Sequence, residues 1–148
     1  MINDFSGKYA FLSNFYHSPI EEDGITYPTV EHYFQAMKTT NIKERQAIAG
    51  APTPGKAKRM GRRTNLRPDW EDVKIEVMRR ALGLKFADPK LANMLIATEK
   101  HTLIEGTSWH DNFWGICYCD KCLTTDFPYE SNHLGLLLME LRQKLKEN

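Results

Sequence analysis

A series of helix start signals in the first half of the chain is the feature that most restricts its fold. Thr29 is a suitable N-cap for a helix in which apolar side chains recur at helical spacing, at positions 30, 33, 34 and 37. Asn41, with a glutamate three residues later, has the pattern of a second capped helix, which we expect to end at Ala49. Thr53 precedes Pro54, and proline at the first helical position loses no hydrogen bond. The stretch from position 29 onward is therefore predicted to be helical.

Apolar stripes extend this prediction toward the C-terminus. A longer helix is expected from Asp69 toward Phe86, and Asp88-Pro89 starts another. The stripe of the longer helix contains Trp70, Val73, Val77, Ala81 and Leu84. A C-terminal helix is expected to bury leucines at positions 134, 137, 138, 141 and 145.

Strands are predicted in few places. The segment from Phe5 to Tyr27 is aromatic and interrupted by glycine and proline, which is typical of short strands and turns. Within it, alternation over residues 11–16 alone indicates an edge strand, and residues 102–105 form a second short candidate strand. A chain of 148 residues has the size of one ordinary domain. We therefore expect an α+β fold, one mostly helical domain over residues 1–148 with a small N-terminal strand region.

Composition narrows the class of protein. Hydrophobic residues make up 41% and charged residues 26%, so the chain can bury a core. No apolar run approaches the length of a membrane span, and the first sixteen residues lack the basic and apolar regions of a signal peptide. We expect a cytoplasmic protein with no membrane contact, and the sequence leaves its oligomeric state open.

One segment is strongly basic although the net charge is only +1. Residues 56–67 contain six basic side chains and no acidic one. Such a run is commonly a solvated helix face. It also suits a phosphate-binding surface, because closely spaced cations repel one another until an anion joins them. Both interpretations stay open from the charge pattern.

The polar side of the helix at Thr29 is the first candidate site. Glu31, Gln35 and Lys38 stand at i, i+4 and i+7, so they share one helical face. Glu31 and Lys38 are separated by about 10 Å along the axis, at about 1.5 Å per residue. That spacing fits a sugar or base between them, although spacing alone favours a solvated polar face. His32 is expected to be a partly exposed packing residue.

A second candidate lies in the long irregular stretch from Gly106 to Ser131. Residues 109–115 read WHDNFWG, and their aromatic side chains follow neither helical nor strand period. Long loops rich in such residues commonly bind ligands, with aspartate able to orient a ribose or a water. The alternative is that the two tryptophans fix the loop to the core.

Three cysteines follow in the same stretch, at positions 117, 119 and 122. Their odd number argues against a disulfide framework. They suit zinc with His110 or His133 as a fourth ligand, but structural zinc sites commonly have two Cys-x-x-Cys-like pairs and here the second is missing. We therefore expect three reduced thiols in a surface loop and no bound metal.

Five motifs, in order along the chain, carry a family resemblance. They are FSGKYAFLSNFY (5–16), YPTVEHYFQAMK (27–38), KAKRMGRRTNLRPDW (56–70), DNFWG (111–115) and NHLG (132–135). With these motifs the chain resembles the NADAR family, which includes the YbiA-like N-glycosidases. The resemblance spans nearly the whole chain and implies hydrolysis of an N-glycosidic bond between ribose and a base, without a cofactor.

The resemblance implies two substrate classes. The preferred one is ADP-ribose attached to guanine in nucleic acid, so that ADP-ribosylated DNA is an expected partner and removal reverses a toxin's modification. The other is the phosphoribosylamino-pyrimidine intermediates of riboflavin synthesis. A non-catalytic ADP-ribose binding module is a third possibility, but such a module does not need Glu31, Lys38 and Asp111 together.

Roles are carried over from the matching motifs. Glu31 is the expected acid or base, Lys38 an amine that attacks the anomeric carbon, and Asp111 a residue that assists at the ribose. The residues expected to bind or surround substrate, from these motifs and the basic segment, are Asn14, Phe15, Gln35, Lys58, Arg62, Trp70 and Trp114.

Overall fold

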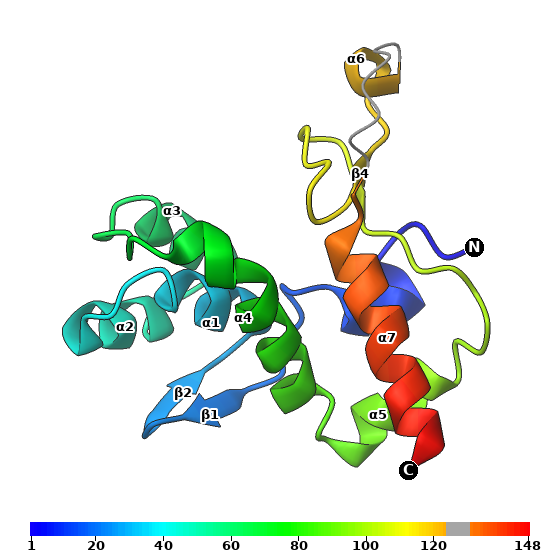
Figure 1. Cartoon of the computed structure of the whole chain (residues 1–148), viewed down its shortest axis with the longest axis horizontal. Coiled ribbons are helices and arrows are strands. Elements are labelled where there is room, and N and C mark those ends of the chain that lie inside the picture. Colours follow the sequence, from blue (N-terminus) through cyan, green and yellow to red (C-terminus); the bar gives the residue numbers. More distant parts are fainter. Residues whose placement is uncertain (124–130) are drawn as a thin grey trace. The chain divides into compact units, whose positions relative to one another are not determined.

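The structure, a computed structural model, describes residues 1–123 and 131–148. These residues form two compact units, one of Asn14–Asp88 and the other of Met1–Ser13 together with Pro89–Asn148. The α+β class and the predominance of helix are confirmed (Figure 1). None of the helices formed by the described residues is both long and apolar enough to cross a membrane.

The unit Asn14–Asp88 begins with a hairpin of strands β1 (Ile20–Glu22) and β2 (Ile25–Tyr27). Asp23 and Gly24 connect them with φ of 53° and 78°, the left-handed pair of a tight hairpin turn. Four helices follow, namely α1 (Val30–Ala36), α2 (Ile42–Ala49), α3 (Pro54–Gly61) and α4 (Trp70–Lys85). The predicted strand region is thus present, followed by the predicted helices.

Local signals in the sequence set the starts of three of these helices. The side-chain oxygens of Thr29, Asn41 and Thr53 each accept a hydrogen bond, at 3.1 Å, from the backbone N–H three residues later. Each bond satisfies an amide that has no partner within its own helix. The predicted N-caps are therefore confirmed.

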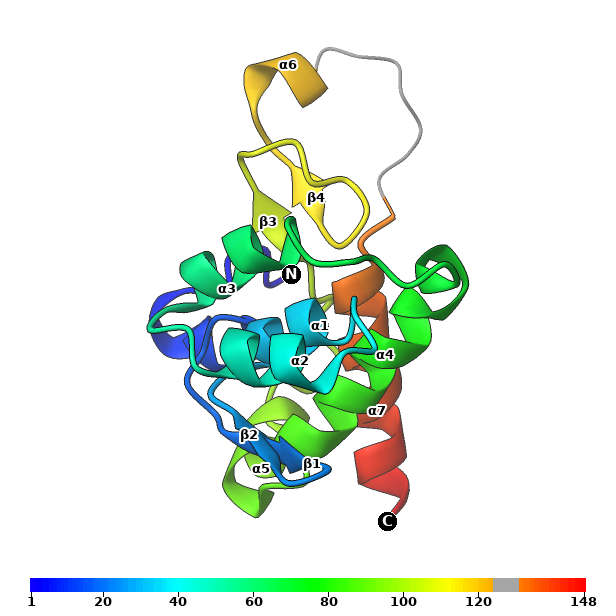
Figure 2. The ribbon, with the colours of Figure 1, turned by 90° about the vertical axis from the view of Figure 1, so that its left-hand side faces the viewer.

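Helix α1 is the centre of this unit. All seven of its residues are buried, and it contacts α2, α3 and α4 (Figure 2). Gly61, the last residue of α3, permits the close approach to α1. A methyl group there would lie 2.9 Å from Cδ and 3.0 Å from Cβ of Gln35, and closer still to its Oε1.

The apolar stripe predicted for α4 is only partly correct. Trp70 and Ala81 are buried, but Val77 and Leu84 are half-buried, and the buried face passes instead through Met78, Leu82 and Lys85. Because Met78 and Leu82, four residues apart, are buried while Val77 and Leu84 are not, the buried face of α4 is rotated about the helix axis from the predicted one. Lys85 is buried because its long stem packs inward and its ammonium lies over the rings of Tyr16 and Phe86, at 5.6 and 5.2 Å.

The second unit contains the remaining elements. They are a 3₁₀ helix η1 (Gly7–Leu12), helices α5 (Pro89–Ile96), α6 (Asp120–Leu123) and α7 (His133–Glu147), and short strands β3 (Gly106–Thr107) and β4 (Ile116–Cys117). Strands β3 and β4 pair in parallel, and α5 packs against α7. Near the end of α7, the buried Arg142 donates from Nη1 to Thr98 Oγ1 at 2.8 Å and to the His101 carbonyl at 2.9 Å.

Two strand predictions are wrong. Residues 11–16 begin inside η1, in which i→i+3 bonds link Ser6 to Tyr9 and Ala10 to Ser13, and consecutive Phe11 and Leu12 are both buried. A half-buried strand would bury only alternate residues.

Residues 102–105 form only a single bridge, between Leu103 and Ile2. The side chain of Asn132 occupies the other hydrogen-bonding positions there. Its Nδ2 donates to the Leu103 carbonyl at 2.9 Å, and its Oδ1 accepts from the Glu105 N–H at 3.1 Å. A side chain thus substitutes for a neighbouring strand, and Gly135 leaves room for it, since a methyl group there would clash with Asn132 and Leu103.

Candidate active site

Glu31 is a buried carboxylate in the first turn of α1. Its side chain is held by Gln35, whose Nε2 donates to Oε1 at 2.7 Å, and its backbone N–H donates to the Asn14 carbonyl at 3.0 Å. Only 7% of Glu31 and 3% of Gln35 is exposed. The interpretation of this surface as a solvated polar face is therefore wrong.

Lys38 lies two residues beyond the helix on which the sequence placed it. Helix α1 ends at Ala36, and the Lys38 N–H bonds to the Gln35 carbonyl at 3.2 Å in a tighter final turn. The Lys38 carbonyl accepts from the Arg67 N–H at 2.8 Å, which fixes the backbone here. The half-buried ammonium lies 5.9 Å from the Phe34 ring and 6.0 Å from the Trp70 ring.

The surroundings of Lys38 favour its neutral amine. Burial lowers the pKa of Lys38, while the negative charge of Glu31 opposes this shift. The nearby cations Arg62, Lys58 and Lys74 lower the pKa further. A neutral amine is the form required for nucleophilic attack on carbon. Glu31, Gln35 and Lys38 therefore form one group, and Arg62 and Lys58 lie near enough to affect it electrostatically.

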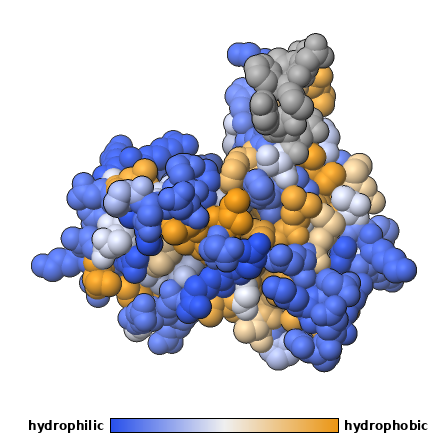
Figure 3. Space-filling model, in the orientation of Figure 1, coloured by the Kyte–Doolittle hydropathy of each residue, from blue (hydrophilic) through white to orange (hydrophobic). Residues whose placement is uncertain are grey.

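The basic segment is amphipathic in α3. Ala57 and Gly61 are buried, whereas Lys56, Arg59 and Arg62 are exposed and Lys58 is half-buried. Hydrophilic residues cover most of this part of the molecule in the view of Figure 3. The cations are thus accessible to an anion as well as to water.

Asn14 and Phe15 precede the hairpin. Asn14 touches Glu31 through its carbonyl, and its side-chain Nδ2 donates to the Met78 sulfur at 3.6 Å. Its buried Oδ1 accepts no hydrogen bond from the described residues. The exposed fraction of Phe15 is 48%, so its ring is accessible to a ligand.

Trp70 is only 5% exposed, so its ring does not offer a free stacking face. It packs against Phe34, with ring centroids 5.0 Å apart and an interplanar angle of 59°. Together the two rings form an apolar surface beneath the Lys38 ammonium.

Asp111 and Trp114 belong to the second unit. Asp111 Oδ1 accepts the N–H groups of Phe113 and Trp114 at 3.1 and 2.9 Å, so this oxygen holds the turn. The Trp114 ring packs edge-on against Phe113 at 4.8 Å and lies 6.2 Å from His133.

A cavity of about 350 Å³ adjoins this turn and is lined by His110, Asp111, Asn112, Phe113 and Ser131. Asp111 therefore lies on an accessible cavity, as a ribose-contacting residue requires.

His32, in contrast, is not a partly exposed residue as expected but a buried one. Its Nε2 donates to the Ala51 carbonyl at 3.0 Å, and its Nδ1 pairs with Thr29 Oγ1 at 2.8 Å. Both ring nitrogens thus have structural partners, which link α1 to the segment after α2.

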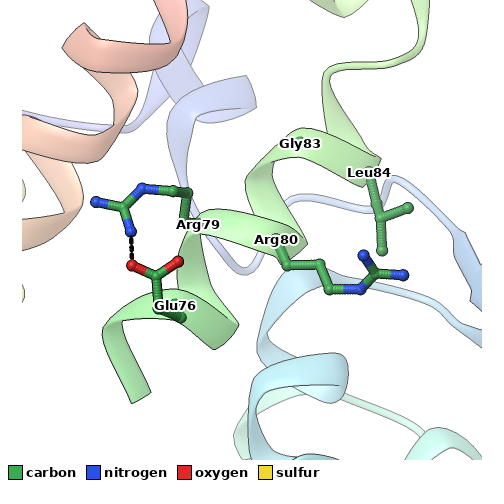
Figure 4. A pocket seen from close by; sticks show the side chains of 5 residues that line it. All are labelled: Glu76, Arg79, Arg80, Gly83 and Leu84. Atoms are coloured by element: carbon green, nitrogen blue, oxygen red, sulfur yellow. Dashed lines mark hydrogen bonds and ion pairs between the residues drawn. The ribbon is translucent and has the colours of Figure 1, made fainter. Parts of the chain in front are cut away.

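Another hollow, of about 340 Å³, lies on α4 and is lined by Glu76, Arg79, Arg80, Gly83 and Leu84 (Figure 4). Glu76 and Arg79 point toward each other and form an ion pair, while Arg80 extends away from them and pairs with Glu22. Glu31 and Lys38 do not line this hollow, so we assign it no part in the site.

The chain is similar to known proteins along nearly its whole length. The NADAR domain family model matches residues 3–146. The N-glycosidase YbiA of Shigella flexneri is 43% identical over 143 residues, which are 95% of this chain and 84% of that protein. The chloroplastic riboflavin biosynthesis protein PYRR of Zea mays is 40% identical over 136 residues, 83% of this chain and 20% of that protein. The NMR structure of the E. coli protein YbiA matches with a TM-score of 0.81 and 40% identity, covering 99% of this chain and 86% of that one.

Proposed function

The chain belongs to the NADAR domain family, and we propose on that premise that it is an N-glycosidase that hydrolyses a bond between ribose and a base. The observation that carries this proposal is that a buried carboxylate, Glu31, lies at the start of the short helix α1 and an amine of lowered pKa, Lys38, lies just beyond the end of the same helix. The names of its N-glycosidase relatives support the same reaction.

Glu31 would act as the acid that protonates the departing base. Breaking a C–N bond at an anomeric carbon develops positive, oxocarbenium-like charge on the sugar, and a nearby carboxylate stabilises it. The base leaves more readily when a carboxylic acid donates a proton to it. Gln35 holds the Glu31 side chain in one orientation through the 2.7 Å hydrogen bond, which reduces the reorganisation required during the reaction.

Lys38 would act as the nucleophile. Its neutral amine attacks the anomeric carbon, the C–N bond to the base breaks, and the base takes a proton from Glu31. The Lys38 nitrogen, positively charged after the attack, returns one proton to the Glu31 carboxylate, and its other proton passes to the ring oxygen as the sugar ring opens to give an imine between Lys38 and the ribose. Water hydrolyses this imine, which frees the amine and releases the sugar, so that one water is consumed per bond broken.

For the substrate, we propose ADP-ribose on guanine in nucleic acid. The exposed cations of α3 suit a polyanionic ligand with a diphosphate and a nucleic-acid backbone. A phosphoribosylamino-pyrimidine is the second candidate, favoured by the name of the Zea mays relative. It carries a single phosphate and needs fewer cations.

The two substrates are separated by a direct assay. Guanine-ADP-ribosylated DNA and the phosphoribosylamino-pyrimidine are incubated with the protein, and released ADP-ribose or ribose phosphate is measured by chromatography. We expect turnover of the first, weakened by added salt. Turnover of the second alone would assign the chain to the other substrate, and binding without turnover of either would contradict the enzymatic proposal.

Glu31→Gln is expected to abolish turnover while preserving the fold, because the amide oxygen can still accept from Gln35. Glu21→Gln, on the exposed strand β1, is a matched control. Turnover at the rate of the unaltered protein in the Glu31→Gln variant would remove Glu31 from the mechanism.

The covalent route predicts an adduct. Borohydride reduction during turnover is expected to add the mass of the sugar to the Lys38 peptide, and Lys38→Ala should abolish this adduct. Lys43→Ala, at an exposed position of α2, should retain it. An unlabelled Lys38 peptide under full turnover would instead assign Lys38 to binding, with Glu31 activating water.

A further inference from the structure

The cysteine stretch of the second unit brings four metal-binding atoms together. A ring nitrogen of His110 and the sulfurs of Cys117, Cys119 and Cys122 all lie within 4.8 Å of one another. Cys117 comes from β4, Cys122 from α6, and Cys119 from the link between them, so different local elements supply the sulfurs. Closeness of the residues in the sequence would not by itself make all four ligand atoms converge on one point.

The spacing of these atoms fits a single tetrahedral ion. His110 Nδ1 lies 3.3 Å from Cys122 Sγ and 3.4 Å from Cys119 Sγ. With Zn–N near ~2.05 Å and Zn–S near ~2.3 Å, tetrahedral angles place nitrogen and sulfur about 3.6 Å apart. The four atoms therefore need to move by only small distances to bind zinc. A two-iron cluster fits less well, because it spreads its four ligands over two metal ions.

Each sulfur also receives at least one N–H hydrogen bond, as thiolate ligands in metal sites commonly do. The His110 N–H donates to Cys117 Sγ at 3.3 Å, and the Cys122 N–H to Cys119 Sγ at 3.4 Å. The third donor is Asn112, whose Nδ2 lies 3.5 Å from Cys122 Sγ. Such bonds to the ligands orient them and stabilise their negative charge.

The backbone of His110 is consistent with this purpose. Its φ is +66°, a left-handed conformation that is uncommon outside glycine, and its ring nitrogen Nδ1 faces the sulfurs of Cys119 and Cys122. His133, the other histidine that the sequence offered, instead stacks on Phe113 with ring centroids 4.5 Å apart. The structure thus selects between the two candidate histidines.

We propose that His110, Cys117, Cys119 and Cys122 bind one structural Zn²⁺. Four protein ligands leave no open coordination position, so the ion holds the loop instead of activating water. This replaces the expectation of three reduced thiols without metal. The sequence already offered the three cysteines with His110 or His133 as zinc ligands, but the missing second Cys-x-x-Cys pair argued against a bound metal; here a single ligand before the cysteines, His110, takes the place of that pair.

The proposal does not depend on the N-glycosidase activity. The full chain, purified under reducing conditions and incubated with equimolar zinc, is expected to retain one zinc per chain after gel filtration. Replacement by Co²⁺ should give the intense visible bands of a tetrahedral thiolate site. Retention of no metal by the unaltered protein, or an octahedral Co²⁺ spectrum, would overturn the proposal.

Two variants identify the ligands. His110→Ala and Cys122→Ser should reduce bound zinc at least tenfold, whereas His101→Ala, at an exposed position of the same unit, should retain one equivalent. Circular dichroism establishes that each variant is folded. If a variant does not fold, the cobalt spectrum of the unaltered protein decides the question, since its charge-transfer intensity reports the number of thiolate ligands. Equal zinc in His110→Ala and His101→Ala would exclude His110 and overturn the four-ligand site.

Discussion

Gly61 couples the packing of α3 to the orientation of the candidate catalytic carboxylate, and replacing it by alanine tests this coupling. The added methyl group would lie 2.9 Å from Cδ and 3.0 Å from Cβ of Gln35. The Cβ is fixed to the buried helix α1, so rotation of the Gln35 side chain cannot relieve the whole overlap. Either α3 moves away, or Gln35 moves and loses its hydrogen bond to Glu31.

The expected cost follows from this overlap. Forcing one methyl group into a well-packed core costs about 1–3 kcal/mol. Alanine in a helix gains up to about 1 kcal/mol over glycine, but Gly61 is the last residue of α3, so this gain is reduced. We therefore expect Gly61→Ala to lower the free energy of unfolding by roughly 1–2 kcal/mol, or about 2–8 °C in Tm for a domain of this size.

Gly83→Ala provides the matched control. Gly83 lies inside α4, it is exposed, and a methyl group there meets no atom within 4 Å. This substitution should stabilise the protein by about 0.5–1 kcal/mol through helix propensity alone. Urea unfolding and kcat/KM are measured for both variants. If Gly61→Ala were as stable and as active as Gly83→Ala, α3 would not pack on Gln35 as described.

The pH dependence and one family motif give further predictions. Because only the neutral amine of Lys38 attacks, the rate should rise with pH until the amine is deprotonated, and the lowered pKa places this rise below the range usual for lysine. Arg62→Gln removes a cation that lowers this pKa, so the rise should move to higher pH; an unchanged pH–rate profile would contradict the electrostatic role of Arg62. Asn132→Ala deprives Leu103 and Glu105 of their partners and should cost about 1–3 kcal/mol in urea unfolding. Asn132→Gly, which suits the φ of +47°, should cost less, and equal stability of both variants with the unaltered protein would show that the side-chain bonds are not needed.

The helices could be predicted where their signals are local. Thr29, Asn41 and Thr53 cap their helices through atoms only three residues away, so sequence spacing alone is sufficient. Leu103 and Glu105 behave differently, because their hydrogen bonds go to Asn132, nearly thirty residues later. No pattern within residues 102–105 contains that information. The predicted buried face of α4 was wrong for the same reason, because the neighbouring elements decide which side of a helix is covered.

The residues of the candidate active site could be predicted from the sequence in a different way. Spacing placed Glu31 and Gln35 on one helical face, and the structure joins them by a hydrogen bond. Spacing alone nevertheless favoured exposure, because burial depends on α2, α3 and α4 packing around α1. The chemical roles of Glu31 and Lys38 came from the family motifs and not from spacing. The proposed zinc site shows the opposite case: the thiols were visible in the sequence, but only the placement of side chains shows that His110, not His133, lies beside them.

The burial of Glu31 and Gln35 is itself an argument for function. A helix that served only as a core would have apolar side chains at these positions, as α1 has at Val30 and Tyr33. Instead it carries a carboxylate and an amide, and the Oε1 atom of Gln35 accepts no hydrogen bond from the described residues. A buried acceptor without a partner costs about 1–3 kcal/mol, and the hydrogen bond to Glu31 returns at most a similar amount, so the pair lacks the net gain that two buried apolar side chains would give. Helix α1 thus gives up stability at the two positions that orient the proposed acid, which is the pattern expected where a reaction, not packing, determines the residue.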